Sequence, residues 1–154
     1  MINKNYYSEA IKLMEDLYGK NVQMSFATSL YDQPSVRVID LVYRDEYFYA
    51  TVHYASNKMK EIAVNPKVSL CQGMFRCWGI AIDEGRLYDE KNKEYIDYFK
   101  RVFYLFYDKH VDDETTSILK IKLEIAYVYA NNYKYIINFA DKTATRSEFV
   151  LEAD

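Results

Sequence analysis

The chain of 154 residues has few of the residues that interrupt regular structure, with four glycines and two prolines. Because glycine and proline dominate tight turns and irregular loops, their scarcity argues against long loops between elements. No run approaches the ~20 apolar residues of a membrane-spanning helix, and the charged, amphipathic start lacks a secretory leader pattern. We therefore expect a cytoplasmic protein with no membrane partner, folded as a single domain over residues 1–154.

Metal ligands and catalytic nucleophiles are also scarce. The two histidines and two cysteines match no zinc spacing. For Cys71 and Cys77, reduced and buried thiols are the expected state, and a cross-strand disulfide is the alternative. The four acidic residues of the segment 104–117 depart from the spacing of a calcium loop, so we interpret them as solvated surface. No metal site is expected, and without a Gly-flanked Ser or Cys nucleophile the catalytic residues stay unassigned.

An excess of basic charge is absent as well. Lysine and arginine together number 20 against 23 acidic residues, and the net charge is −3. The basic residues are scattered among the acidic ones, whereas nucleic-acid binding depends on a basic stripe that neutralises phosphates. We therefore expect no nucleic-acid partner.

Aromatic and apolar residues are abundant instead, with 17 tyrosines and half of the chain apolar. Helical spacing of apolar residues predicts a helix over Tyr7–Tyr18, ended at Gly19, and another from Glu90 to about Val102. The predicted strands are Val22–Leu30, Ser35–Tyr43, Tyr47–Val52, Lys67–Phe75, Cys77–Leu87, Ile118–Tyr129 and Tyr133–Phe139. Their short connections require antiparallel hairpins. The pattern predicts a mainly β protein with flanking helices (α+β), built on a closed or split antiparallel barrel.

A short helix is predicted between Ser56, its N-cap, and Pro66, which stops it. Lys58 then falls in the first turn, where a cation opposes the helix dipole by ~0.3–1 kcal/mol. A phosphate bound to the exposed amides would reverse that cost. The alternative is that Lys58 extends into water, where screening makes the penalty small, and these residues alone favour it.

Arg37 interrupts the otherwise apolar segment 35–43. Side chains of a strand alternate between its faces, so Arg37 could pair with Asp40 only by reaching around the strand. A phosphate is a better-matched partner, because the planar guanidinium can hold two of its oxygens. Together with Lys58, Arg37 therefore favours a bound phosphate.

In order and spacing, the segments "SVRVIDLVY", "YFYAT", "SNKMKEIAVNPKVSL" and "DEG" resemble the pyridoxamine-phosphate-oxidase-like flavin proteins. The resemblance covers about Gln23 to Leu87. It implies a homodimeric split barrel that binds flavin mononucleotide (FMN) at the subunit interface. The tail lacks the Trp and the Arg-rich segment of the true oxidases, and the chain looks most similar to the small nitroimidazole-reductase-like and general-stress members.

The resemblance also implies a set of cofactor-binding residues. Arg37 and Lys58 match the basic phosphate contacts, and Ser56 with Asn57 matches the start of the phosphate-binding helix. The strand that lies along the flavin ring in the family matches Val38, Ile39, Asp40, Leu41 and Val42. The pair before the cofactor loop matches Ala50 and Thr51. Where the oxidases commonly have a flavin-contacting Gln, the spacing gives Ile80.

Two functions follow as hypotheses. The first is an FMN-dependent oxidoreductase that reduces a small molecule, nitro compounds included, with a nicotinamide donor, NADH or NADPH. The alternative is a binding module that holds flavin, haem or deazaflavin without turnover. His53 could face the cofactor, serve as an axial haem ligand or cap the end of a strand, and the last is favoured for a single histidine.

Overall fold

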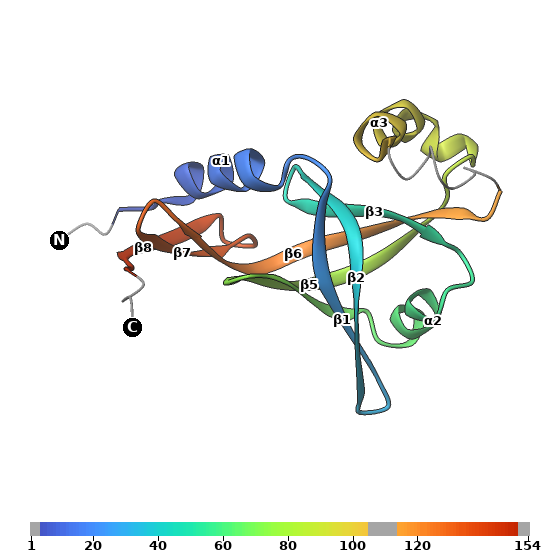
Figure 1. The fold of residues 1–154 in the computed structure, drawn as a ribbon, viewed down its shortest axis with the longest axis horizontal. Coiled ribbons are helices and arrows are strands. Elements are labelled where there is room, and N and C mark those ends of the chain that lie inside the picture. The colour runs from blue at the N-terminus through green and yellow to red at the C-terminus, as the bar shows by residue number, and fades with distance from the viewer. Residues whose placement is uncertain (1–3, 105–113, 151–154) are drawn as a thin grey trace.

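The computed structural model, which describes residues 4–104 and 114–150, consists of antiparallel strands and four short helical segments (Figure 1). The described strands are β1 (Val22–Leu30), β2 (Gln33–Arg44), β3 (Tyr47–His53), β4 (Lys67–Gln72), β5 (Phe75–Arg86), β6 (Thr116–Ala130), β7 (Tyr133–Asn138) and β8 (Thr143–Glu148). They form one sheet in the order β3-β2-β1-β4-β5-β6-β7-β8. Because β3 also pairs with β6, the first six strands close into a barrel. The predicted antiparallel barrel is confirmed.

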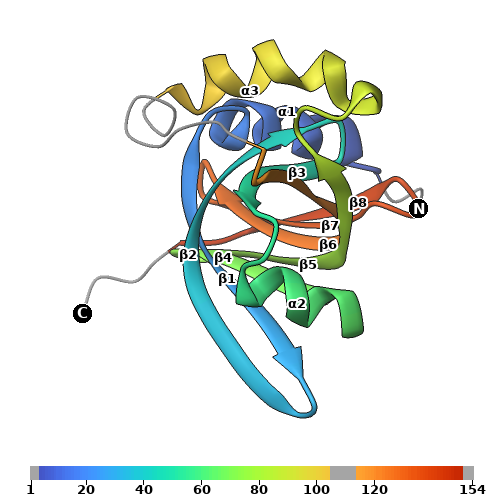
Figure 2. The ribbon, with the colours of Figure 1, turned by 90° about the vertical axis from the view of Figure 1, so that its right-hand side faces the viewer.

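The helices lie at the margins of the barrel. They are α1 (Tyr7–Tyr18), α2 (Asn57–Val64), the 3-10 helix η1 (Glu90–Tyr95) and α3 (Ile96–Val102). Figure 1 shows α1 beside β7 and β8, whereas α2 and α3 lie towards the opposite end. In Figure 2, α2 lies below the barrel strands, on the side to which the β1–β2 hairpin extends. No helix within the described residues is long and apolar enough to cross a bilayer.

Two separate groups of buried side chains hold these elements together. The larger fills the barrel and includes the inward-facing Ile39 and Leu41 of β2. Val42 points to the other face of the same strand, because side chains alternate along β2. There it packs in a second cluster, which lies beneath η1 and α3. The buried members of this second cluster are Val42, Tyr49, Leu87, Phe99, Phe103 and Ile118. The second cluster therefore attaches α3 to the outside of the barrel.

Several predicted boundaries are wrong. The turn between β4 and β5 lies at Gly73, whose φ of 57° suits glycine, and not at Arg76. The helix expected over 90–102 is divided into η1 and α3. β8, which runs from Thr143 to Glu148, was not predicted. Only Ala144 is buried in it, so its sequence carries no strand-like apolar pattern. At Gly85, whose φ is 89°, the register between β5 and β6 shifts.

Both cysteines are free thiols, with Cys77 buried and Cys71 exposed. The reduced state was expected, but the burial predicted for Cys71 is wrong. Burial raises the pKa of the Cys77 thiol, so this group stays protonated and unreactive. In a Cys71→Ser variant, we expect no labelling by a maleimide in the folded protein and one label per chain in denaturant. Rapid labelling of the folded variant would contradict the burial of Cys77.

Candidate functional site

The barrel is split between β2 and β3. These strands are paired only next to the turn that joins them, from Val42 with Tyr49 to Arg44 with Tyr47. Farther from the turn, β2 continues along β1 and β3 continues along β6, so their facing edges separate. Figure 1 shows this divergence. Within the described part of the chain it leaves one edge of β2, around residues 37–41, without a neighbouring strand, so the backbone groups of that edge are available to a ligand.

A pocket of about 260 Å³ lies in this split. Its lining comes from both strands, from the first turn of α2 and from the residue that follows α3. The lining residues are Ile39, Asp40, Thr51, Val52, His53, Lys58 and Phe103. Larger hollows exist elsewhere, and those of about 630 and 370 Å³ share Trp78 on the outer face of the sheet. We take the smaller pocket as the candidate site, because it combines a cation, a carboxylate, a hydroxyl and an imidazole.

Lys58 brings a positive charge to this pocket. It is partly buried, and no carboxylate among the described residues lies within ion-pair distance of its ammonium group. Burial lowers the pKa of Lys58, and the nearby charge of Arg37 lowers it further. A cation in this environment is stabilised by an anionic ligand.

Ser56 precedes α2 in the N-cap position, but its side chain makes no capping hydrogen bond. Its hydroxyl Oγ is buried and has no hydrogen-bond partner among the residues that the structure describes. The expectation that this side chain caps the helix is therefore wrong. An unpaired buried hydroxyl is costly, and a ligand oxygen at the start of α2 would satisfy it together with the first free amides of the helix. The donor set at this end of α2 fits a phosphate.

Arg37 has a protein partner that its sequence neighbours did not indicate. Its Nη2 donates to Oε2 of Glu61, on α2, over 2.9 Å. Its Nη1 donates to Thr28 Oγ1 over 2.8 Å and to the carbonyl oxygen of Phe26 over 3.3 Å. Neither Asp40 nor a bound phosphate is needed to balance this guanidinium. A direct contact of Arg37 with phosphate stays a prediction.

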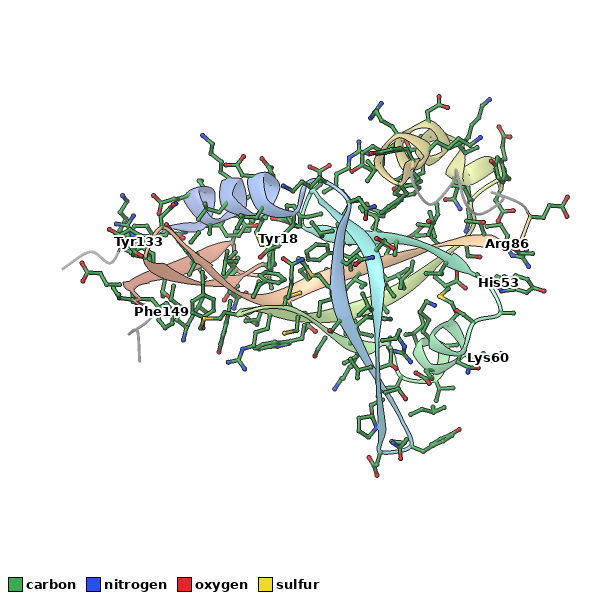
Figure 3. The ribbon with its side chains drawn as sticks, in the orientation of Figure 1. Tyr18, His53, Lys60, Arg86, Tyr133 and Phe149 are labelled. Carbon is green, nitrogen blue, oxygen red and sulfur yellow. The ribbon has the colours of Figure 1, made fainter. Side chains whose placement is uncertain are left out.

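His53 ends β3 at the edge of the pocket. Its Nδ1 accepts a hydrogen bond from the Ala55 amide over 3.1 Å, which agrees with the strand-capping interpretation. In the neutral imidazole this bond leaves the proton on Nε2. The imidazole stacks on the ring of Tyr54, with the two ring centres 5.1 Å apart. The guanidinium of Arg86 lies 3.6 Å from the centre of the Tyr54 ring. Figure 3 shows His53 and Arg86 at the same end of the barrel.

No protein-family model and no curated protein matches this sequence. Solved structures do match its fold. One, from Clostridium acetobutylicum, is a protein related to general stress protein 26 of the pyridoxinephosphate oxidase family (15% identity, 89% of this chain and 96% of that one, TM-score 0.58). A NimC/NimA family protein of the same organism shares 15% identity over 91% of both chains, with a TM-score of 0.55. An FAD-binding protein from Mesorhizobium loti shares 16% identity over 77% of this chain and 90% of that one, with a TM-score of 0.60.

The chain has the pyridoxamine-phosphate-oxidase-like split-barrel fold. This confirms the fold inferred from the sequence resemblance. At such low sequence identities the similarity is one of fold. The function must therefore be inferred from the residues of this chain.

The split-barrel structure brings some of the predicted cofactor-binding residues together and separates others. Four line the pocket, namely Ile39, Asp40, Thr51 and Lys58. Ala50 is buried in the barrel interior, while Val38 and Asn57 are exposed outside the pocket lining. The pocket lies at the edges of β2 and β3, where residues of both strand faces reach it, so strand alternation alone does not predict which of them line it.

Sequence reasoning missed Glu61, Thr28 and Phe103. Phe103 belongs to the second cluster and closes the pocket from the side of α3. Its approach to β2 and β3 depends on tertiary packing, which no local pattern signals. Among the described residues, no group of three His, Cys, Asp or Glu side chains is arranged to hold a metal ion.

Proposed function

We propose that this protein binds FMN in the split between β2 and β3, with the phosphate at the start of α2. The observation that carries the proposal is that Lys58 lines this pocket, partly buried and without a carboxylate partner among the described residues. Two positions earlier in the chain, the buried hydroxyl of Ser56 has no hydrogen-bond partner among the same residues. Asp40 and Thr51 line the same pocket and offer hydrogen-bonding groups to the ring. The FAD-binding protein with this fold supports a flavin as the ligand.

We further propose that the bound protein is a reductase of small molecules. Flavin supplies the hydride and electron transfer, so the chain itself needs no paired acid and base. Its own residues bind and orient the cofactor, and Phe103 excludes water from one side of the pocket. A nicotinamide is the donor to test first, with nitro compounds as the first acceptors.

The absorption spectrum of the purified protein tests the cofactor, because flavin, deazaflavin and haem have different spectra. We expect the spectrum of oxidised flavin, bleached by NADH or NADPH without oxygen and restored by a nitro compound. A bound flavin that no nicotinamide bleaches would favour the alternative, a non-catalytic binding module. A haem spectrum, or no ligand after addition of FMN, would contradict the proposal.

A second copy of the chain completes the site in this proposal. The pocket of about 260 Å³ is smaller than the ~300–1,000 Å³ typical of sites for ligands of this size. Beside it, the outer sheet face presents exposed apolar side chains, with Val36 68%, Val38 62% and Trp78 36% exposed. Cross-strand pairing aligns Val36, Ala27, Ser69, Trp78 and Ile125 in one row across β2, β1, β4, β5 and β6. An apolar face of this kind favours association.

A charge placed on that face tests the dimer. The wild type should have twice the 18.3 kDa mass of one chain in light scattering at micromolar concentration. We expect Val36→Glu to be monomeric and to bind both FMN and riboflavin more weakly, because the charge would be buried at the interface. Val64→Glu, at an exposed valine of α2, is the matched control and should remain dimeric. A monomeric wild type, or a dimeric Val36→Glu variant, would count against this interface.

A further inference from the structure

The two cations near the start of α2 differ in what surrounds them. Lys58 has no carboxylate partner among the described residues and lines the pocket. Arg37 lies near enough to lower the pKa of Lys58 through its charge, but three of its donor contacts are taken by protein oxygens. As far as the described residues go, a ligand therefore meets Lys58 as a free cation and Arg37 as one that is already neutralised.

Glu61 provides this neutralisation. Its Oε2 accepts from Arg37 Nη2 over 2.9 Å and also accepts from the hydroxyl of Thr28. The hydrogen bond from Thr28 and the contact with Arg37 lower the pKa of Glu61, so its carboxyl is ionised at neutral pH. Thr28 in turn accepts from Arg37 Nη1 over 2.8 Å and is almost fully buried. The three side chains form a closed set of hydrogen bonds between β1, β2 and α2.

We propose that Glu61 is a positioning residue that reserves Arg37 for attaching α2 to the barrel and limits the affinity of the site for phosphate. The inference rests on the proposed FMN site and extends it. With Glu61 ionised, the net charge of Arg37 and Glu61 is zero, and the phosphate is held by Lys58 and by the start of α2. The carboxylate also repels the phosphate through space. This chain should therefore discriminate less between FMN and riboflavin than a site with two free cations.

Substitution of Glu61 by Gln tests this, since Gln has the shape of Glu and can still accept from Arg37 and Thr28. Titration with FMN and riboflavin gives the ratio of the two affinities. We expect the FMN affinity of Glu61→Gln to rise about ten-fold and the riboflavin affinity to stay constant, because only FMN carries the phosphate. Glu61→Asp, which keeps the charge, should have the wild-type ratio. Glu15→Gln, on α1, makes the same change in net charge and should leave the ratio unchanged.

Binding of inorganic phosphate tests the phosphate site without the flavin ring. It should raise the melting temperature of ligand-free Glu61→Gln more than that of the ligand-free wild type, because binding to the folded state stabilises it. If the wild type binds both flavins but the ratio of FMN affinity to riboflavin affinity is unchanged or lower in Glu61→Gln, the proposed role of Glu61 is wrong. The proposed FMN site would stand. Equal shifts of the two melting temperatures would also overturn the role of Glu61. A wild type that binds neither flavin would overturn the proposed function and this inference together.

Discussion

Replacement of Lys58 by Ala should weaken FMN binding by about ten-fold to a hundred-fold and leave riboflavin binding nearly unchanged. A charge-assisted hydrogen bond to phosphate contributes roughly 1.5–3 kcal/mol, which corresponds to this range of affinity. Lys58 lines the pocket, is partly buried and has no carboxylate partner among residues 4–104 and 114–150. Titration of wild type and variant with both ligands measures the two losses separately.

Riboflavin is the internal control, because it has the same ring without the phosphate. Lys60→Ala provides a matched variant, since Lys60 is an exposed lysine of the same helix that does not line the pocket. The affinity of the wild type for FMN should also fall at alkaline pH. Burial lowers the pKa of Lys58, so its charge is lost at a lower pH than that of an ordinary lysine. Equal losses for FMN and riboflavin, or no loss for either, would remove Lys58 from the phosphate site.

The sequence was sufficient to predict the strands of the barrel but not the last strand of the sheet. β1 matches its predicted bounds, because a β-branched, apolar segment between turns has few other options. β8 could not be predicted, since it is held by backbone pairing with β7 and by few apolar contacts. The guanidinium carbon of Arg146, on β8, instead lies 4.4 Å from the ring centre of Tyr6 and 4.2 Å from that of Tyr133. These contacts join segments that are far apart in the sequence.

At the site, local signals located α2 and non-local contacts decided what its residues do. The first-turn position of Lys58 was readable from Ser56 and Pro66, and the structure has α2 between them. The ion pair of Arg37 with Glu61 joins residues 24 apart in the sequence, so no spacing rule on a strand or helix predicts it. The helical rule that side chains three or four positions apart are neighbours would instead pair Glu61 with Lys58, three positions earlier. Because Glu61 pairs with Arg37, Lys58 has no carboxylate partner within residues 4–104 and 114–150.

The second cluster makes an independent prediction about the wall of the pocket. Phe99 is fully buried and stacks on Tyr95 and Phe103, with ring centroids 5.4 and 5.9 Å away. Truncation of a buried Phe to Ala typically costs ~3–5 kcal/mol, so we expect Phe99→Ala to lower the melting temperature by about 6–20 °C. The barrel interior is a separate cluster, and the far-UV circular dichroism below the transition should stay that of a β protein.

Loss of this packing should also affect ligands, because Phe103 closes the pocket from the side of α3. We expect Phe99→Ala to weaken FMN and riboflavin binding by the same factor, in contrast to Lys58→Ala, since the wall contacts no phosphate-specific group. Tyr104→Ala is the control, because Tyr104 is 58% exposed and its truncation should change stability by less than about 0.5 kcal/mol. If Phe99→Ala reduced FMN binding alone, the second cluster would act on the phosphate end of the site and not on its wall.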